Sequence, residues 1–493
     1  MSSYYFSETI KEQLKHDAPY AWFLYRQSEK SSLFKKENIE TLKEKLDAYM
    51  DCFILSEKAD DSLLDNFLNL DDWGASYVMA KVALVCNDEE RLNQVVENID
   101  EQEKSKELID ALCEMSYEKI YEKLNNFLSH DNEWIRVVAI ETLIYFNASI
   151  ETKDISTLLK KDNPKVQASL LRLIAKNRLK NFDDEIKEFL NSENHELQYH
   201  AIYAGCYLDL DIAQQELKLF CLKESAYLKE AITLLYAVIE ESEQEEMYEK
   251  INIATTSKRI QAHNSLLLGY PEFIPSLIEN MKELKYALYW GETFSCITGM
   301  DLEDDDLARE EVLTEEEEEI ILQSIKEEKY CEEYEKDLAL PDVDLITQWW
   351  ENHKSEFVNS SRYLAGKKVT TENLENIRNS GNQVERNISR ETLAFQNRKS
   401  IELKDKKIRY TGVLLKEEKK EERDSSIPTI HLKSKQIAPK TGRYQATLAK
   451  GHPKEEWLRN SGFDIKTVKL GKNIGTFGFD ESEADIVWKY LGE

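Results

Sequence analysis

Apolar residues recur every 31 positions in the middle of this chain, between about residues 124 and 260. A period of this size is typical of a repeat protein, in which each unit is one supersecondary element that packs on the next. Four sets of apolar residues, called columns below, each repeat at this spacing over four units. The last column has a fifth member, Ile260, which is one residue out of phase. The columns are Leu124, Ile155, Ile186 and Leu217; Phe127, Leu158, Phe189 and Phe220; Leu128, Leu159, Leu190 and Cys221; and Ile135, Val166, Leu197 and Leu228.

Each 31-residue unit is predicted to be a pair of helices. The first helix has apolar residues at i, i+3 and i+4, and a short polar turn separates it from the second. Asn132, Asn163 and Asn194 stand where an N-cap side chain accepts a backbone N–H, and Pro164 stands at a first helical position. The run Asp-Asn-Pro-Lys-Val-Gln-Ala at 162–168 resembles the turn and second helix of HEAT repeats. We expect at least five such pairs, over residues 119–300.

Residues 1–118 are predicted to form an N-terminal helical cap, because their apolar stripes are less regular. A helix is expected over Ser7–Ser28, although Pro19 predicts that a new helix begins there. Another is expected over Glu37–Lys58. Shorter helical pieces follow at Asp61–Asn69, Gly74–Cys86, Asp88–Asn98 and Lys104–Glu114.

Residues 301–395 are predicted to hold an acidic strip followed by C-terminal helices, one of them near Glu372–Phe395. Between Asp301 and Asp337 there are 18 acidic and 4 basic residues. The strip is either a solvated surface or a docking site for a basic partner. Its candidate binding residues are Asp304, Asp305, Asp306, Glu315, Glu316 and Glu317. Trp349 and Trp350 either anchor a partner or dock the C-terminal helices on the repeats.

Residues 396–428 are mixed in charge and are predicted to be a linker with one short strand at Ile408–Leu415. Residues 429–493 alternate apolar and polar side chains, which predicts a small α+β module. Its expected strands are Ile430–Lys433, Tyr444–Leu448, Ile465–Lys469 and Thr476–Phe479, with a short helix at His452–Leu458. The predicted fold class is therefore mostly α: a HEAT-like α-solenoid of antiparallel helix pairs with a small C-terminal α+β module.

A formal net charge of −30 argues against binding to nucleic acid or to anionic lipid, which need a basic surface. The charge favours a basic protein partner, or it serves solubility alone. No apolar run approaches the ~18 residues that span a bilayer, and the first residues are polar. We therefore expect a cytoplasmic protein without a membrane partner. The seven cysteines stand singly, which predicts that most are small buried apolar residues.

The sequence gives no motif for a metal, a cofactor or a catalytic group. His195 and His200 are spaced i, i+5, whereas two metal ligands on one helical face need i, i+4. The Gly471–Gly475 segment lacks the Gly-Lys-Ser/Thr ending of a phosphate loop, and no GxSxG motif occurs. We expect no enzyme, no cofactor and no metal. A helical-repeat nucleic-acid enzyme of the glycosylase kind stays open as an alternative.

Motifs on both sides of the repeats resemble those of one family, the bacterial HEAT-repeat proteins encoded in type VI secretion gene clusters near spike and PAAR-tip genes. The opening helix motif is at His16–Arg26, and Leu46–Asp51 resembles the helix that follows it. After the repeats, Phe294–Leu302 is similar to the Phe-x-x-Ile-Thr-Gly-x-Asp-Leu signature. The closing motif is at Arg362–Thr370, Gly381–Arg386 and Glu391–Ala394. The family usually has Gln-Arg-Gln-Arg where this chain has Asn-Gln-Val-Glu-Arg at 382–386.

This resemblance covers residues 10 to 395 and implies a cytoplasmic accessory of secretion or of a toxin cassette. Arg362, Tyr363, Gln383 and Arg386 of the closing motif complete the candidate binding residues. The expected function is a non-catalytic scaffold that binds a secreted effector or a PAAR/spike-type protein, as an immunity protein or an adaptor. A structural component of the secretion machine is a further alternative.

Overall fold

A computed structural model describes residues 8–58, 64, 72–148, 150–160, 163–310, 313–396, 431–433, 442–447, 465–468 and 486–492. The chain divides into two compact units, Met1–Val413 and Leu414–Glu493, which are treated separately below. The boundary lies inside the segment predicted to be a linker. The described residues are mostly helical, as the sequence predicts.

Five helices form the N-terminal part of the first unit: α1 (Glu8–Ser28), α2 (Lys36–Lys58), α3 (Ala75–Cys86), α4 (Glu89–Glu97) and α5 (Gln102–Cys113). The predicted break at Pro19 is wrong, because α1 continues through it. Proline has no N–H to donate to the carbonyl of Lys15, but its fixed φ is compatible with a helix. The predicted piece Asp61–Asn69 lies, apart from Leu64, outside the described residues.

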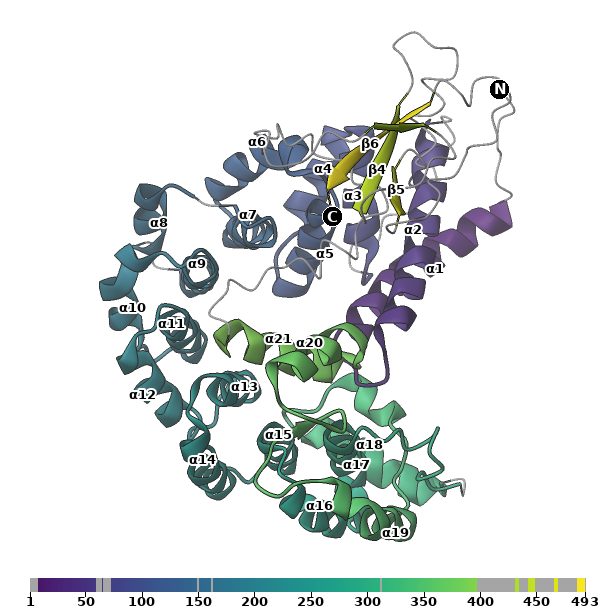
Figure 1. Cartoon of the computed structure of the whole chain (residues 1–493). Coiled ribbons are helices and arrows are strands. Elements are labelled where there is room, and N and C mark those ends of the chain that lie inside the picture. Colours follow the sequence, from purple (N-terminus) through teal and green to yellow (C-terminus); the bar gives the residue numbers. More distant parts are fainter. Residues whose placement is uncertain are drawn as a thin grey trace. The chain divides into compact units, whose positions relative to one another are not determined.

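Six helix pairs follow, and Figure 1 shows them in two rows, the first helix of each pair outside and the second inside. Neighbouring inner helices contact one another along the row, from α7 to α17. Short 3-10 turns, η1 (Lys180–Phe182) and η2 (Pro271–Phe273), precede α10 and α16. The pairs are α6 (Tyr117–Leu128) and α7 (Glu133–Tyr145); α8 (Thr152–Leu159) and α9 (Pro164–Asn177); α10 (Asp183–Phe189) and α11 (His195–Tyr207); α12 (Asp211–Phe220) and α13 (Leu228–Val238); α14 (Glu241–Ala254) and α15 (Lys258–Leu268); and α16 (Ile274–Met281) and α17 (Leu284–Thr298).

An asparagine caps the inner helix in the first three of these pairs, as predicted. Asn132, Asn163 and Asn194 each accept a backbone N–H two residues ahead. Gln167 donates a side-chain hydrogen bond to the carbonyl of Leu159 at 2.8 Å, and Gln198, 31 positions later, repeats this bond. The first and fourth apolar columns are buried throughout, whereas Phe127, Leu128 and Phe189 of the second and third columns are only partly buried.

The last part of the first unit contains α18 (Glu315–Glu327), η3 (Glu333–Asp337), α19 (Val343–His353), η4 (Lys354–Glu356), the hairpin β1 (Tyr363–Leu364) and β2 (Lys367–Lys368), α20 (Thr371–Ser380) and α21 (Gln383–Gln396). The helix predicted over Glu372–Phe395 is therefore two helices. Gly381 separates them with an extended backbone, which ends α20.

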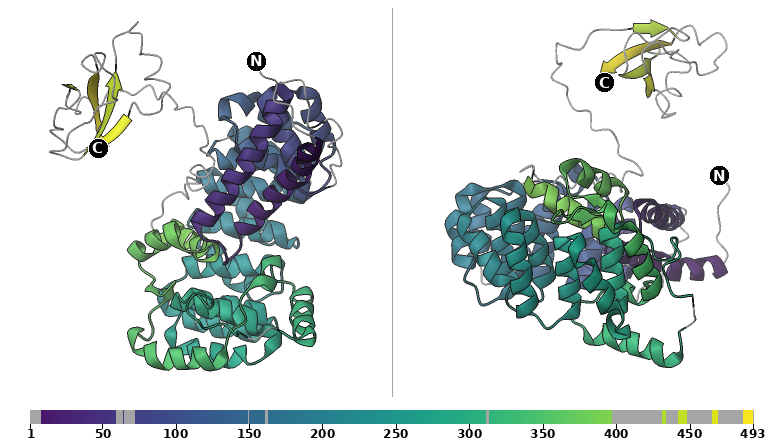
Figure 2. Two further views of the ribbon diagram at one scale, coloured as in Figure 1. Left: turned by 90° about the vertical axis from the view of Figure 1, so that its right-hand side faces the viewer. Right: turned by 60° about the horizontal axis from the view of Figure 1, so that its bottom comes forward.

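Helices α20 and α21 lie on the inner side of the double row (Figure 1). There α21 packs on α13, and the Phe395 ring contacts Tyr207 of α11 at 4.6 Å between centroids. Figure 2 shows α20 and α21 between the N-terminal helices and the middle helices. The backbone N–H of Gln383 donates to the carbonyl of Phe34 in the α1–α2 turn at 3.2 Å. The inner side thus carries the chain's own C-terminal helices.

The second unit contains a four-stranded antiparallel sheet in the order β3-β6-β4-β5. Its strands are β3 (His431–Lys433), β4 (Gly442–Thr447), β5 (Ile465–Val468) and β6 (Val487–Gly492). The sequence predicted β3, β4 and β5 but missed β6, whose Trp488 is fully buried. The strands predicted at 408–415 and 476–479 and the helix at 452–458 lie outside the described residues.

None of the helices in the described part of the chain combines the length and the apolar character that crossing a bilayer requires.

Candidate functional site

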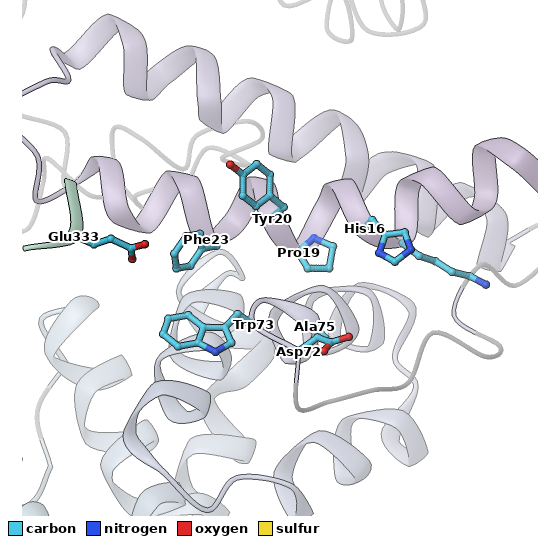
Figure 3. A pocket seen from close by; sticks show the side chains of 9 residues that line it. His16, Pro19, Tyr20, Phe23, Asp72, Trp73, Ala75 and Glu333 are labelled. Atoms are coloured by element: carbon cyan, nitrogen blue, oxygen red, sulfur yellow. The ribbon is translucent and has the colours of Figure 1, made fainter. Parts of the chain in front are cut away.

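A pocket of about 560 Å³ lies between α1, the turn before α3 and η3 (Figure 3). Three aromatic rings, those of Tyr20, Phe23 and Trp73, face it (Figure 3). Its other lining residues are Lys15, His16, Pro19, Asp72, Ala75 and Glu333. The Tyr20 side chain is 63% exposed and Trp73 is 59% exposed, which is unusual for aromatic residues. The pocket is therefore an open aromatic surface.

The helical spacing of the buried residues in α1 explains why the Tyr20 side chain points outward. Leu14, Ala18 and Trp22 follow the helical spacing that faces the core, and all three are buried. Trp22 stacks on Tyr77 of α3 at 5.9 Å between ring centroids. Tyr20 lies two residues from Ala18 and from Trp22, which places it on the opposite face of the helix.

The turn before α3 presents Trp73 to the same pocket. Gly74 has a left-handed backbone (φ 83°), and its α-carbon lies against the backbone of Pro19 in α1. The carboxylate of Glu107 in α5 accepts the backbone N–H groups of Gly74 and Tyr77, each at 3.0 Å. Burial raises the pKa of Glu107 to about 7, although these N–H groups act in the opposite direction. The Trp73 turn is therefore fixed from two sides.

The three rings form a corner. Tyr20 and Phe23 lie nearly parallel, with centroids 6.5 Å apart and an interplanar angle of 27°. Trp73 meets Phe23 edge-on at 5.4 Å and 77°. A ligand that enters the corner therefore meets aromatic faces from more than one direction.

Charged groups line the pocket beside the rings. The carboxylates are those of Asp72 and Glu333. Within η3, an oxygen of the Glu333 carboxylate lies 3.5 Å from the ammonium nitrogen of Lys336. The ammonium group of Lys15 donates to Glu12 at 2.9 Å, so its charge is matched within α1.

A buried ion cluster fixes the η3 segment that presents Glu333. Arg259 of α15 donates to Glu335 of η3 at 3.0 Å and to Glu292 of α17 at 2.6 Å. Glu292 also accepts hydrogen bonds from Tyr334 at 2.7 Å and from Ser32 of the α1–α2 turn at 2.6 Å. Burial alone would raise the pKa of Glu292, but Arg259 and the two hydroxyl donors hold it below its usual value. This cluster joins η3 and the α1–α2 turn to the last repeat.

Of the two candidate tryptophan anchors, one is buried and the other is partly buried. Trp350 is buried and contacts Phe357 at 5.4 Å. Trp349 packs edge-on against Phe294 of α17 at 5.6 Å and stacks on His353. This geometry corresponds to the alternative interpretation, in which the pair docks α19 on the repeats.

The four candidates from the closing motif also point inward. Arg362 donates to the carbonyl oxygens of Leu267 at 2.8 Å and Tyr236 at 3.4 Å, and Tyr363 is buried. Gln383 and Arg386 are buried in α21, and Arg386 donates to the carbonyl of Arg378 at 2.8 Å. In this structure they hold the hairpin and the C-terminal helices in place, and their binding role stays a prediction.

The acidic candidates are mostly exposed. Asp304, Asp305 and Asp306 lie in one turn after α17, and Glu315 and Glu316 lie in the first turn of α18. Glu317 is half-buried, accepts from Arg309 at 2.9 Å and forms a capping box with Thr314. The structure brings none of these six into the aromatic pocket, whose lining takes only Glu333 from the acidic strip.

Tyr20 and Trp73 were missing from the predicted site. A signal for Tyr20 was present, because it is an aromatic residue off the apolar stripe of its helix. Trp73 has no such signal, since a tryptophan in a turn is exposed or covered according to contacts that are distant in sequence.

The residues that the structure describes contain no side-chain group of the kind that holds a metal ion. No three His, Cys, Asp or Glu side chains gather there as a metal site requires. Burial lowers the pKa of His200 and of His263 far below the usual value, which keeps both imidazoles neutral. Burial raises the pKa of the thiols of Cys206, Cys221 and Cys296, so they remain protonated and unreactive.

Comparison of the chain with protein-family models, with curated proteins and with solved structures finds no match in any of the three.

Proposed function

We propose that this chain is a non-catalytic protein-binding scaffold that engages a basic secreted effector or a PAAR/spike-type protein of a type VI secretion system. The observation that carries the proposal is the open aromatic pocket of Tyr20, Phe23 and Trp73, because aromatic residues dominate the energetics of protein interfaces. Four of its lining residues, His16, Pro19, Tyr20 and Phe23, lie in the opening motif that resembles the family.

The proposed architecture is a HEAT-like α-solenoid with a small C-terminal α+β module. It is supported by the two rows of helices in Figure 1, by the 31-residue period and by the repeated asparagine N-caps. In such a fold each pair is stabilised mainly by its neighbours, and the array offers long surfaces for other proteins.

A basic partner is supported by the net charge of −30 and by the exposed acidic turn at Asp304–Asp306. Opposite charge speeds the encounter of two proteins and disfavours partners of like charge. A cytoplasmic location is part of this proposal, since an immunity protein or adaptor meets its effector before secretion.

The nucleic-acid enzyme is less well supported. It needs a basic inner surface, but Arg172 of the inner helix α9 pairs with Glu141. Lys176 on the same helix interacts with Glu391 of α21, which itself lies on the inner side. These charges are therefore balanced within the chain.

Co-expression with the proteins encoded beside this gene tests the proposal. The tagged chain is expected to retain a basic effector or tip protein at low salt and, more weakly, at high salt. Failure to retain any of them at either salt concentration would contradict it. Deleting the gene then separates the two roles: self-intoxication means immunity, and loss of effector delivery means an adaptor. Assembly of the chain into large oligomers would instead favour the structural component.

A further inference from the structure

We infer that the aromatic pocket of Tyr20, Phe23 and Trp73 is a receptor for an arginine side chain of the basic partner. This inference rests on the proposed function and specifies the chemistry of its site. The argument comes from the ring geometry, the carboxylates and the rigidity of the walls.

The rings supply faces for a cation. An aromatic face carries a negative quadrupole, and a cation within about 6 Å of the ring centroid is attracted to it. More than half of the Tyr20 and Trp73 side chains is exposed, so these surfaces are open to solvent. Phe23 lies 6.5 Å from Tyr20 and 5.4 Å from Trp73, which joins the three rings into one corner.

The charges favour a cation over a neutral apolar side chain. Asp72 and Glu333 contribute two carboxylates to the lining, and the one lysine, Lys15, donates to Glu12. Glu333 is 61% exposed and lies 3.5 Å from the ammonium group of Lys336 through one carboxylate oxygen, so its other oxygen can accept from a donor outside the chain. A guanidinium group is planar, stacks on rings and donates several hydrogen bonds, which suits rings beside carboxylates better than a compact ammonium group does.

The walls are held before a ligand arrives. Gly74 packs on Pro19, and Glu107 accepts the N–H groups at the start of α3, which fixes the turn of Trp73. Arg259 holds Glu335, two residues from Glu333. The free-energy cost of ordering the site on binding is therefore small.

The test measures binding of a short fluorescent peptide to the full chain by fluorescence anisotropy. The peptide is arginine-rich, and a matched peptide carries citrulline, which has a similar shape but no charge, at the same positions. We expect the arginine peptide to bind at least about tenfold more tightly, and a lysine peptide to fall between the two. Equal affinity of the arginine and citrulline peptides would overturn the inference.

Matched variants locate the binding. Trp73→Leu and Tyr20→Leu keep apolar area but remove an aromatic face, so each should weaken arginine-peptide binding about 3- to 30-fold. Glu333→Gln should weaken it as well. Tyr121→Leu, which changes a half-exposed tyrosine of α6 outside the pocket, is the control and should have no effect. If Trp73→Leu binds like the wild type, the peptide is held elsewhere and the inference fails.

The same variant separates this inference from the proposed function. If a neighbouring-gene protein co-purifies equally with the wild type and with Trp73→Leu, the scaffold proposal stands and the arginine receptor fails. If no such protein co-purifies but arginine binding depends on Trp73, the receptor stands and the scaffold proposal fails.

Discussion

Gly74 lies so close to Pro19 that a Cβ atom on Gly74 would be 2.5 Å from the carbonyl oxygen of Pro19. The two backbones touch where α1 meets the start of α3, and Pro19 itself lines the aromatic pocket. The fit also uses the left-handed backbone of Gly74, a conformation that costs other residues about 1–2 kcal/mol. A single atom at this position therefore affects both the packing of α1 and the pocket.

Gly74→Ala is expected to lower the free energy of unfolding by about 2–4 kcal/mol, because backbone strain and overpacking add. Chemical denaturation followed by circular dichroism measures the change. Trp73→Leu, one residue away and exposed, is the control and should unfold at nearly the wild-type denaturant concentration. An unchanged midpoint for Gly74→Ala would mean that α1 does not pack on this turn.

The raised pKa of Glu107 predicts that the free energy of unfolding falls as the pH rises, which is the opposite of the effect of most carboxylates. Its pKa is raised from 4.5 to about 7 in the fold, so the unfolded chain releases this proton first as pH rises. The contribution of Glu107 to stability is therefore lost between about pH 4.5 and pH 7, by about 3 kcal/mol, and is constant above that. Thermal unfolding of wild type and Glu107→Gln from pH 5.5 to 8 should show the wild type losing more stability. Parallel curves would contradict the prediction.

Arg259→Met leaves the buried carboxylates of Glu292 and Glu335 without their shared cation. Breaking a buried ion pair in this way costs about 3–5 kcal/mol, and we expect a loss of that size. The η3 segment should also become a site of rapid cleavage in limited proteolysis. Lys282→Met, which removes an exposed ion pair with Glu279, should change neither property. Wild-type resistance of η3 in Arg259→Met would show that other contacts hold this segment.

Arg362→Ala should destabilise the chain by about 1–3 kcal/mol, because two partly buried carbonyl oxygens lose a charged donor. Its arginine-peptide affinity, measured below the unfolding transition, should equal that of the wild type. A variant that keeps full stability but loses the peptide would instead assign Arg362 to the binding surface.

The acidic turn should affect the rate of association more than the lifetime of the complex. Replacing Asp304, Asp305 and Asp306 together with Asn keeps the side-chain shape, and Asn tolerates the left-handed backbone of residue 306. At low salt the association rate with the basic partner should fall about threefold, and the difference should vanish at high salt. Stopped-flow mixing measures both rates. A change confined to dissociation would place these residues inside the interface.

The two buried columns of the 31-residue pattern were predictable because each of their positions is buried in every unit. Ile155 and Ile186 are buried for the same reason, and Asn163 and Asn194 cap helices in the same place. The 31-residue period therefore predicts which positions are buried and which cap a helix, and this prediction does not require the rest of the fold. The mostly helical class followed from it.

The pocket was not predictable from such local patterns. Trp349 and Tyr20 are both aromatic residues in helices, but Trp349 packs against Phe294 and is partly buried, whereas Tyr20 is 63% exposed. Which aromatic residue is covered depends on helices far away in the sequence. The ion cluster of Arg259, Glu292 and Glu335 has the same origin, since 95 acidic and 65 basic residues give no local sign of which will pair.

The contact between Phe34 and Gln383 joins an early segment of the chain to one that is synthesised much later. The repeats stack on neighbours in sequence and can assemble as they leave the ribosome. The α1–α2 turn cannot reach its final contacts with Asn382 and Gln383 until almost the whole first unit has been translated. The hydrogen bond that Ser32 of the same turn donates to Glu292 likewise forms only after residue 292 has been synthesised. A nascent chain whose residues 382 and 383 have not yet left the ribosome therefore exposes the surfaces that these late contacts cover.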